Sequence, residues 1–265
     1  MSEATSETPR VIYEKQGHTA HIRFSNPAAH NALTSQMWHQ LRDAARDIAA
    51  DRAIRVATFR GVGAKAFISG TDISKFADYT TGQQGVDYER DIDECMSAVD
   101  AIPCTTIALV EGWAVGGGMN ISAACDFRIA TPDARFGSPI GRTIGNCLSA
   151  LSLARIGGAV GVQYAKRMVL LGEFLTAQQL HDSGFLLRIV ERDALETEAE
   201  ALCQRAAENA PLTTRVTKET LLRGQKALLP DIEDLIALVY GSADFRKGVA
   251  QFLARTKTLP DWAGE

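Results

Sequence analysis

The sequence predicts an α/β body over about the first two-thirds of the chain and a module of helices over the last quarter. Short β-branched runs alternate with stretches of helical periodicity up to about residue 190, whereas the chain from Asp193 onward has helical patterns throughout. The 265 residues are 46% hydrophobic, which is enough for one large core or for one domain with an appendage.

The first elements follow from short local signals. Residues 11–13 and 19–24 flank a Gln-Gly pair and predict a β-hairpin. Thr34 is expected to cap a helix that runs to about Ala50 and carries apolar side chains on one face. Strands are expected over residues 55–59 and 66–68.

A turn and a helix follow these strands. Asp72 is expected to cap a helix that begins near Ile73. Residues 76–87 have no clear period and contain two glycines, which predicts a mobile loop. The next helix is expected over residues 91–101, with Pro103 ending it.

The most informative stretch combines a buried strand, three glycines and a short apolar helix. Residues 105–110 predict the strand, Gly116 to Gly118 follow, and residues 119–124 predict the helix. Glycine lets the backbone approach a ligand closely, and a helix start directs free N–H groups and a positive dipole end at it. This stretch can therefore present backbone donors to an anion, or to a carbonyl that becomes one. A tight turn in a packed core is the alternative, and a dinucleotide fingerprint is disfavoured because Ile121 replaces its third glycine. Trp113, which precedes the glycines, is expected to pack in the core rather than to line a site.

The rest of the chain is mainly helical. Strands are expected over residues 127–130 and 185–190, and the expected helices are 161–171, 176–183, 193–209, 211–224, 231–240 and 242–254. Residues such as Leu235, Leu238 and Val239 give the last helices apolar faces that are too small to bury one another. Packing against another subunit is therefore expected.

Composition excludes several classes. A net charge of −4 and a pI of about 5.8 argue against a nucleic-acid surface. Five scattered cysteines fit a reducing compartment, and a cytoplasmic location is expected. Residues 1–10 are polar, which predicts a disordered tail rather than a signal peptide, and no apolar run is long enough to span a membrane.

Two spaced blocks resemble the crotonase superfamily, also called the enoyl-CoA hydratase/isomerase family. The blocks are GAKAFISGTDI, from Gly63 to Ile73, and VEGWAVGGGMNISAACDFRIATPDARFG, from Val110 to Gly137. The segment from Ser242 to Lys257 is similar to the C-terminal segment of the family. The resemblance implies a spiral of ββα units over residues 11–192, followed over residues 193–265 by a helical module that forms trimers or hexamers.

The resemblance also implies a ligand and a site. Family members bind acyl-CoA thioesters, so coenzyme A is expected as part of the substrate and no permanently bound cofactor or metal is expected. The backbone N–H groups of Thr71 and Gly117 are the implied oxyanion hole. The implied substrate- and CoA-binding residues are Lys65, Ala66, Ile68, Gly70, Asp72, Ile73, Lys75, Gly116, Ile140, Phe252 and Lys257.

The acid–base positions depart from the family pattern. Family hydratases carry two glutamates where this chain has Asn120 and Ile140, and neither replacement can exchange a proton. The stretch after Phe136-Gly137 looks most like the aryl-CoA dehalogenase branch, with Cys147 where that branch has a nucleophilic aspartate. Cys147 is then a candidate nucleophile or base if its pKa is lowered, and otherwise an inert buried thiol. The other candidates are the titratable residues between Asp78 and Glu94, most of which are expected to form a solvated face.

The sequence therefore predicts an acyl-CoA-processing enzyme with a retained oxyanion hole and atypical acid–base residues. The alternatives are a non-hydratase member, either an isomerase or a hydrolase using Cys147, and a catalytically impaired paralogue that binds acyl-CoA. A dehydrogenase is disfavoured because the helix after the glycines is too short for a βαβ crossover.

Overall fold

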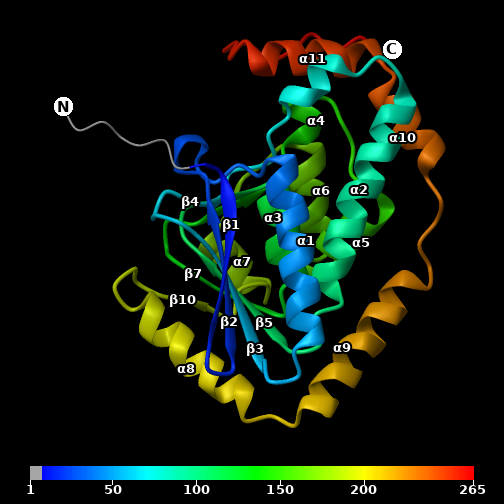
Figure 1. Ribbon diagram of the computed structural model, residues 1–265. Coiled ribbons are helices and arrows are strands. Elements are labelled where there is room, and N and C mark those ends of the chain that lie inside the picture. Colours follow the sequence, from blue (N-terminus) through cyan, green and yellow to red (C-terminus); the bar gives the residue numbers. More distant parts are fainter. Residues whose placement is uncertain (1–7) are drawn as a thin grey trace.

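A computed structural model describes residues 8–265, and Figure 1 shows its arrangement. Residues 1–7 of the tail expected over residues 1–10 lie outside the described residues. Arg10 already belongs to the first strand. Within the described part of the chain, no helix is both long and apolar enough to cross a membrane.

The larger sheet has six strands in the order β1-β2-β3-β5-β7-β10. Only β1 and β2 are antiparallel, as the predicted hairpin requires, and the other neighbours are parallel. The strands are β1 (Arg10–Gln16), β2 (Thr19–Ser25), β3 (Val56–Gly61), β5 (Thr105–Val110), β7 (Phe127–Ala130) and β10 (Arg188–Ile189). Every residue of β5 is buried, which is why it appears in the sequence as a continuous apolar run.

A second, smaller sheet was not predicted. Its order is β4-β6-β8-β9, formed by β4 (Ala66–Ile68), β6 (Trp113–Val115), β8 (Arg135–Gly137) and β9 (Leu175–Thr176). The chain passes repeatedly from the larger sheet to the smaller one and then into a helix, as in β3-β4-α2, β5-β6-α3 and β7-β8-α4. This repeated path is the expected spiral of ββα units.

The helices of the body pack on these sheets. They are α1 (Ser35–Ala50), α2 (Gly82–Asp100), α3 (Gly117–Ala124), α4 (Ile140–Thr143), α5 (Ala150–Val160), α6 (Val162–Leu170) and α7 (Ala177–Asp182). Helix α1 begins as predicted, because the Met37 amide donates to the Thr34 hydroxyl at 3.2 Å. The short 3₁₀ helix η2 (Ser74–Asp78) follows the Asp72 turn, where the Ser74 amide donates to the Asp72 carboxylate at 2.9 Å.

The predicted loop over residues 76–87 was wrong at both ends, because η2 extends to Asp78 and only residues 79–81 lie between the two helices. Helix α2 begins at Gly82, and the Thr81 amide donates to the Gln84 side chain at 3.0 Å, which caps the helix start. The two glycines are in this helix because α10 packs closely against it. A side-chain carbon at Gly82 would lie 2.0 Å from the Ala237 carbonyl oxygen.

The last helices are α8 (Leu195–Ala207), α9 (Pro211–Lys226), α10 (Glu233–Tyr240) and α11 (Ala243–Leu253). Figure 1 shows α8 and α9 passing around one end of the body, α10 beside α2, and α11 across the opposite end. Ile236, Tyr240 and Phe245 of this module share an apolar core with Phe76 and Ile140 of the body. The module therefore completes the end of the molecule at which the cavity described next lies.

Candidate active site

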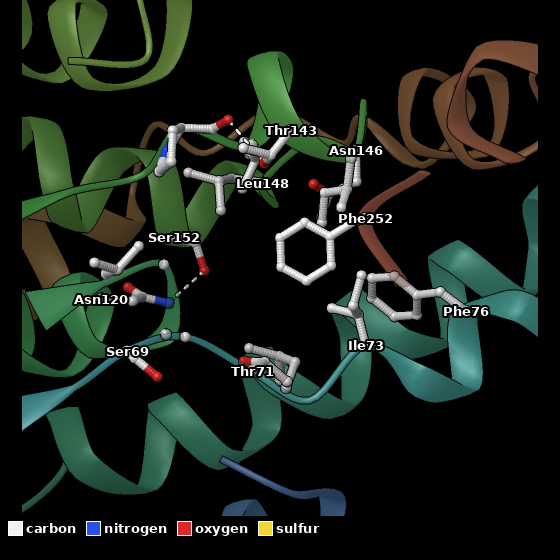
Figure 2. Close-up of a pocket in the computed structure, with 18 of the residues that line it drawn as sticks. Ser69, Thr71, Ile73, Phe76, Asn120, Thr143, Asn146, Leu148, Ser152 and Phe252 are labelled. Atoms are coloured by element: carbon white, nitrogen blue, oxygen red, sulfur yellow. Dashed lines mark hydrogen bonds between the residues drawn. The ribbon is translucent and has the colours of Figure 1, made fainter. Parts of the chain in front are cut away.

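A cavity of about 360 Å³ opens between the Ser69–Ile73 turn, helix α2, the start of α3, the segment after β8 and helix α11. Most of its wall is apolar. Figure 2 shows Phe76, Leu148 and Phe252 among the side chains that surround it. Such a cavity, with a few polar groups in an apolar wall, is the usual form of a small-molecule site.

The two glycine turns meet in the wall of this cavity. A side-chain carbon at Gly117 would lie 3.0 Å from the Thr71 hydroxyl oxygen, and one at Gly116 would lie 3.9 Å from the Gly70 Cα. Gly116 has φ = 52°, a conformation that favours glycine, and it turns the chain from β6 into α3. The sequence expectation that these turns face the same ligand is consistent with this contact.

Within residues 8–265, the backbone pairing around both turns does not use the amides of Thr71 and Gly117. Gly117 is the first residue of α3, and the first N–H groups of a helix have no partner within the helix. Thr71 pairs with Leu33, but the bonds are made by the neighbours of Thr71: Leu33 donates to the Gly70 carbonyl at 2.9 Å, and Asp72 donates to the Leu33 carbonyl at 2.8 Å. The Thr71 N–H therefore points away from Leu33.

Asn120 lines the cavity but is held by a polar network. Its Oδ1 accepts from Arg155 at 2.9 Å, and its Nδ2 donates to the Ser152 hydroxyl at 3.0 Å, the bond drawn in Figure 2. Arginine can only donate, which fixes the orientation of the amide. Arg155 is in turn paired with Asp100 at 2.6 Å, and both side chains are almost fully buried. Asn120 therefore offers the cavity one further N–H and no basic group.

Ile140, the second position at which the resemblance implies a glutamate, contributes only an apolar wall. Ile140 is 9% exposed and lines the cavity. Cys147 does not line it, although Asn146 and Leu148 on either side do. Cys147 was a candidate nucleophile or base only if its pKa were lowered, but burial raises the pKa of its thiol to about 12.

Glu89 is the unexpected member of the site. It belongs to a stretch expected to be solvated, yet it is 4% exposed and lines the cavity. The Tyr240 hydroxyl donates to its Oε1 at 2.6 Å, and the Ser149 amide donates to its Oε2 at 3.0 Å. Burial raises the pKa of this carboxyl to about 7. Among the described residues that line the cavity, Glu89 and Tyr88 are the titratable ones, and burial raises the pKa of Tyr88 further above neutrality.

The other sequence-expected binding residues fall into two groups. Gly70, Ile73, Gly116 and Phe252 line the cavity. Ala66 and Ile68 are buried in β4, Asp72 caps a turn, and the three lysines are exposed outside the cavity: Lys65, Lys75 and Lys257. Lys65 lines a second hollow together with Arg135 and Arg192. This hollow shares Ser69 and Trp113 with the cavity.

Trp113 was expected to pack in the core, and this was wrong. Its side chain is 44% exposed, lines the cavity and packs edge-on against Phe174 with 5.0 Å between ring centroids. In strand β6 the side chain of Ala114 is buried in the interior, and successive side chains of a strand point to opposite faces. The side chain of Trp113 therefore points away from the core.

One group of side chains has metal-ligand chemistry. The ligand atoms of His39, Asp91 and Cys95 lie within 4.8 Å of one another, on α1 and α2. The pKa of the Cys95 thiol is raised to about 12, chiefly by burial, and Arg42 lies near it. None of the three lines the cavity.

Comparison with known proteins decides the family. The profile of the enoyl-CoA hydratase/isomerase family matches residues 14–265. The chain belongs to this family. As a member of the enoyl-CoA hydratase/isomerase family, it is similar to the short-chain-enoyl-CoA hydratase of Clostridium acetobutylicum, with 27% identity over 259 residues that cover 95% of this chain and 97% of the relative.

Solved structures of the family share the fold. An enoyl-CoA hydratase/carnithine racemase from Magnetospirillum magneticum has a TM-score of 0.77 and 31% identity, and the match covers 96% of both chains. A methylmalonyl-CoA decarboxylase solved in complex with 2-nitronate-propionyl-CoA has a TM-score of 0.86, with 96% of this chain and 98% of that chain covered. Its identity is 24%, so this similarity concerns the fold alone. The predicted membership and the crotonase-like α/β fold are thus confirmed.

Proposed function

We propose that this enzyme processes an acyl-CoA thioester by stabilising its enolate with the backbone N–H groups of Thr71 and Gly117. The observation that carries the proposal is the contact between the two glycine turns in the wall of one largely apolar cavity. Enolate formation places negative charge on the thioester oxygen, and fixed donors stabilise that charge most in the transition state. The acyl group then occupies the apolar cavity.

Coenzyme A enters as part of the substrate. The hollow beside Ser69 carries Lys65, Arg135 and Arg192. Arg192 also pairs with Asp133 at 2.9 Å, but the cationic side chains outnumber this acidic one and suit the phosphates of CoA. Lys75 and Lys257 are exposed and remain proposed phosphate contacts. Because the hollow shares residues with the cavity, one ligand can occupy both.

The reaction is proposed to use atypical acid–base residues. Asn120 and Ile140 give this chain no glutamate pair, so hydration by two carboxylates is disfavoured. Isomerisation, hydrolysis through Cys147 and simple acyl-CoA binding remain the alternatives. The raised pKa of Cys147 and its position outside the cavity make the cysteine route the weakest of these.

Removal of one donor tests the proposal. Thr71→Pro deletes the N–H, whereas Thr71→Ala keeps it and serves as the matched variant. Loss of an oxyanion donor typically lowers the rate about 100- to 1000-fold. We expect this loss, measured as deuterium exchange at the carbon next to the thioester, in the folded proline variant only. Equal rates in the two variants, with the fold retained by circular dichroism, would contradict the proposal.

Assembly into a trimer or hexamer is also proposed. Leu212, Leu221 and Leu238 of α9 and α10 are 72%, 71% and 69% exposed in the single chain. Such surfaces usually pack against another subunit. Light scattering at micromolar concentration should give a trimer or hexamer, and a monomer alone would contradict the proposed assembly.

A further inference from the structure

We infer that Glu89 is the acid–base group of this site, moving a proton from one carbon of the acyl chain to another, with Tyr240 as its positioning residue. The inference rests on the proposed function, because Thr71 and Gly117 must hold the enolate that forms when Glu89 takes the proton. It places the chemistry on α2 and on the C-terminal module rather than at positions 120 and 140.

The first argument is position. Glu89 supplies the carboxyl group of the cavity wall among the described lining residues, and Asn120 and Ile140 supply no basic atom there. Tyr88, the residue before Glu89, has the Thr71 side chain as a hydrogen-bond partner. The carboxyl-bearing turn of α2 is therefore next to the turn that carries one of the two proposed oxyanion donors.

The second argument is how Glu89 is held. Its two oxygens each accept one hydrogen bond, from the Tyr240 hydroxyl and from the Ser149 amide, and the Asn146 side chain donates to Tyr240 at 3.2 Å. A backbone amide can only donate, so it stabilises the ionised form of Glu89. Each oxygen keeps a second lone pair that can take a proton. Glu89 is thus fixed in place but still able to react.

The third argument is the ease of proton exchange. The titratable groups around Glu89 are Asp93, Tyr79, Tyr88, Cys147 and Tyr240. The pKa values of the tyrosines and of the cysteine are raised, so these groups stay neutral near pH 7. Burial, assisted by the charge of Asp93, raises the pKa of Glu89 to about 7, where a carboxyl both accepts and returns a proton readily.

A single such group suits a proton shift along the chain. In a 3-enoyl thioester, the Glu89 carboxylate takes a proton from C2, and the electron pair of that C–H bond passes to the thioester oxygen. The electron pair then returns from the oxygen to re-form the carbonyl, a double bond forms between C2 and C3, and the electrons of the former C3–C4 double bond take the proton from Glu89 at C4. No water, oxidant or second reactant is consumed, so the step balances with one carboxyl group.

The test compares Glu89→Gln with Asp87→Asn, a matched loss of charge on the same helix at a side chain that is 59% exposed. The probe is 3-butenoyl-CoA in deuterated water, and deuterium at C2 and C4 is measured by mass spectrometry. Glu89→Gln should exchange about 100- to 10,000-fold more slowly, while the Kd for butyryl-CoA stays within a few-fold. Asp87→Asn should exchange at the rate of the unmodified protein. Exchange by Glu89→Gln at the unmodified rate would overturn the inference and leave the oxyanion hole standing.

Tyr240→Phe provides a second readout that a purely structural role would not change. The lost hydrogen bond stabilises ionised Glu89, so the midpoint of the pH–rate profile should rise by about half to one pH unit. An unchanged midpoint would remove Tyr240 from the assignment. Binding of butyryl-CoA without any exchange by the unmodified protein would overturn the role of Glu89 and favour an acyl-CoA-binding paralogue. No binding at all would instead refute the proposed function.

Discussion

Gly85 is where the close packing of α2 against α10 can be tested most sharply. A side-chain carbon there would lie 2.0 Å from Tyr240 Cγ and 2.3 Å from Tyr240 Cβ. Carbon atoms in contact are about 3.5–4.0 Å apart, so Gly85→Ala requires a movement of more than about 1 Å. Tyr240 is 0% exposed and packs against Phe245 with 4.8 Å between ring centroids, so its ring has no free space.

The expected effect is a difference of two terms. Alanine in place of glycine within a helix stabilises it by about 1 kcal/mol. Overpacking costs about 1–3 kcal/mol and occasionally more, and here the clash includes Tyr240 Cβ, which a side-chain rotation moves little. Taking the upper end of that range, about 3 kcal/mol, against the helix gain of about 1 kcal/mol, we expect Gly85→Ala to lower the free energy of unfolding by about 2 kcal/mol net.

Gly224→Ala is the matched control. Gly224 is in α9, and a side-chain carbon there would meet nothing within 4 Å. Urea unfolding should therefore show a gain of up to about 1 kcal/mol for this variant. A Gly85→Ala protein at least as stable as the unmodified one, with Gly224→Ala behaving as expected, would refute the packing argument.

Three further predictions concern charge and chemistry. Because the pKa of Glu89 is raised to about 7 in the folded protein, the stability that this group contributes is present below about pH 4.3 and is lost as the pH rises through 7. In urea unfolding, the stability of Glu89→Gln relative to the unmodified protein should thus rise by up to about 3 kcal/mol between pH 4.5 and 8. A difference that stays constant with pH would contradict the raised pKa. Arg155→Met leaves the Asp100 charge buried and unpaired, so thermal or urea unfolding should show a loss of about 3–5 kcal/mol, whereas Arg223→Met at a 78% exposed side chain should change little. Crotonyl-CoA hydration, followed by absorbance, should be slower than that of ordinary hydratases by several orders of magnitude, since each acid–base group typically contributes about 100- to 10,000-fold.

The sequence predicted the larger elements because their signals are local and repeated. The expected bounds of β5 and β7 match the structure, since buried parallel strands appear as continuous apolar runs. Of the smaller sheet, only the strand over residues 66–68 was predicted, because its strands have two or three residues, too few to show a period. Trp113 was misplaced for the same reason.

The site was only partly predictable. The two glycine turns are visible as sequence blocks, and the structure brings Thr71 and Gly117 together. Glu89 was missed because Gly82 and Gly85 were interpreted as loop residues, which hid the periodicity of the helix. Val86, Glu89 and Ile92 are spaced by three residues and are all buried, so a helix prediction that began at Gly82 would have placed Glu89 on the apolar face. Its partner Tyr240 is 151 residues away, and sequence spacing alone gives no signal for that contact.

The most direct measurement is a crystal structure with a bound unreactive acyl-CoA thioester, such as butyryl-CoA. The account predicts that the thioester oxygen lies about 2.7–3.2 Å from the backbone nitrogens of both Thr71 and Gly117, with the acyl chain directed into the cavity beside Glu89. A thioester oxygen bound elsewhere, or two nitrogens too far apart to share one oxygen, would contradict it.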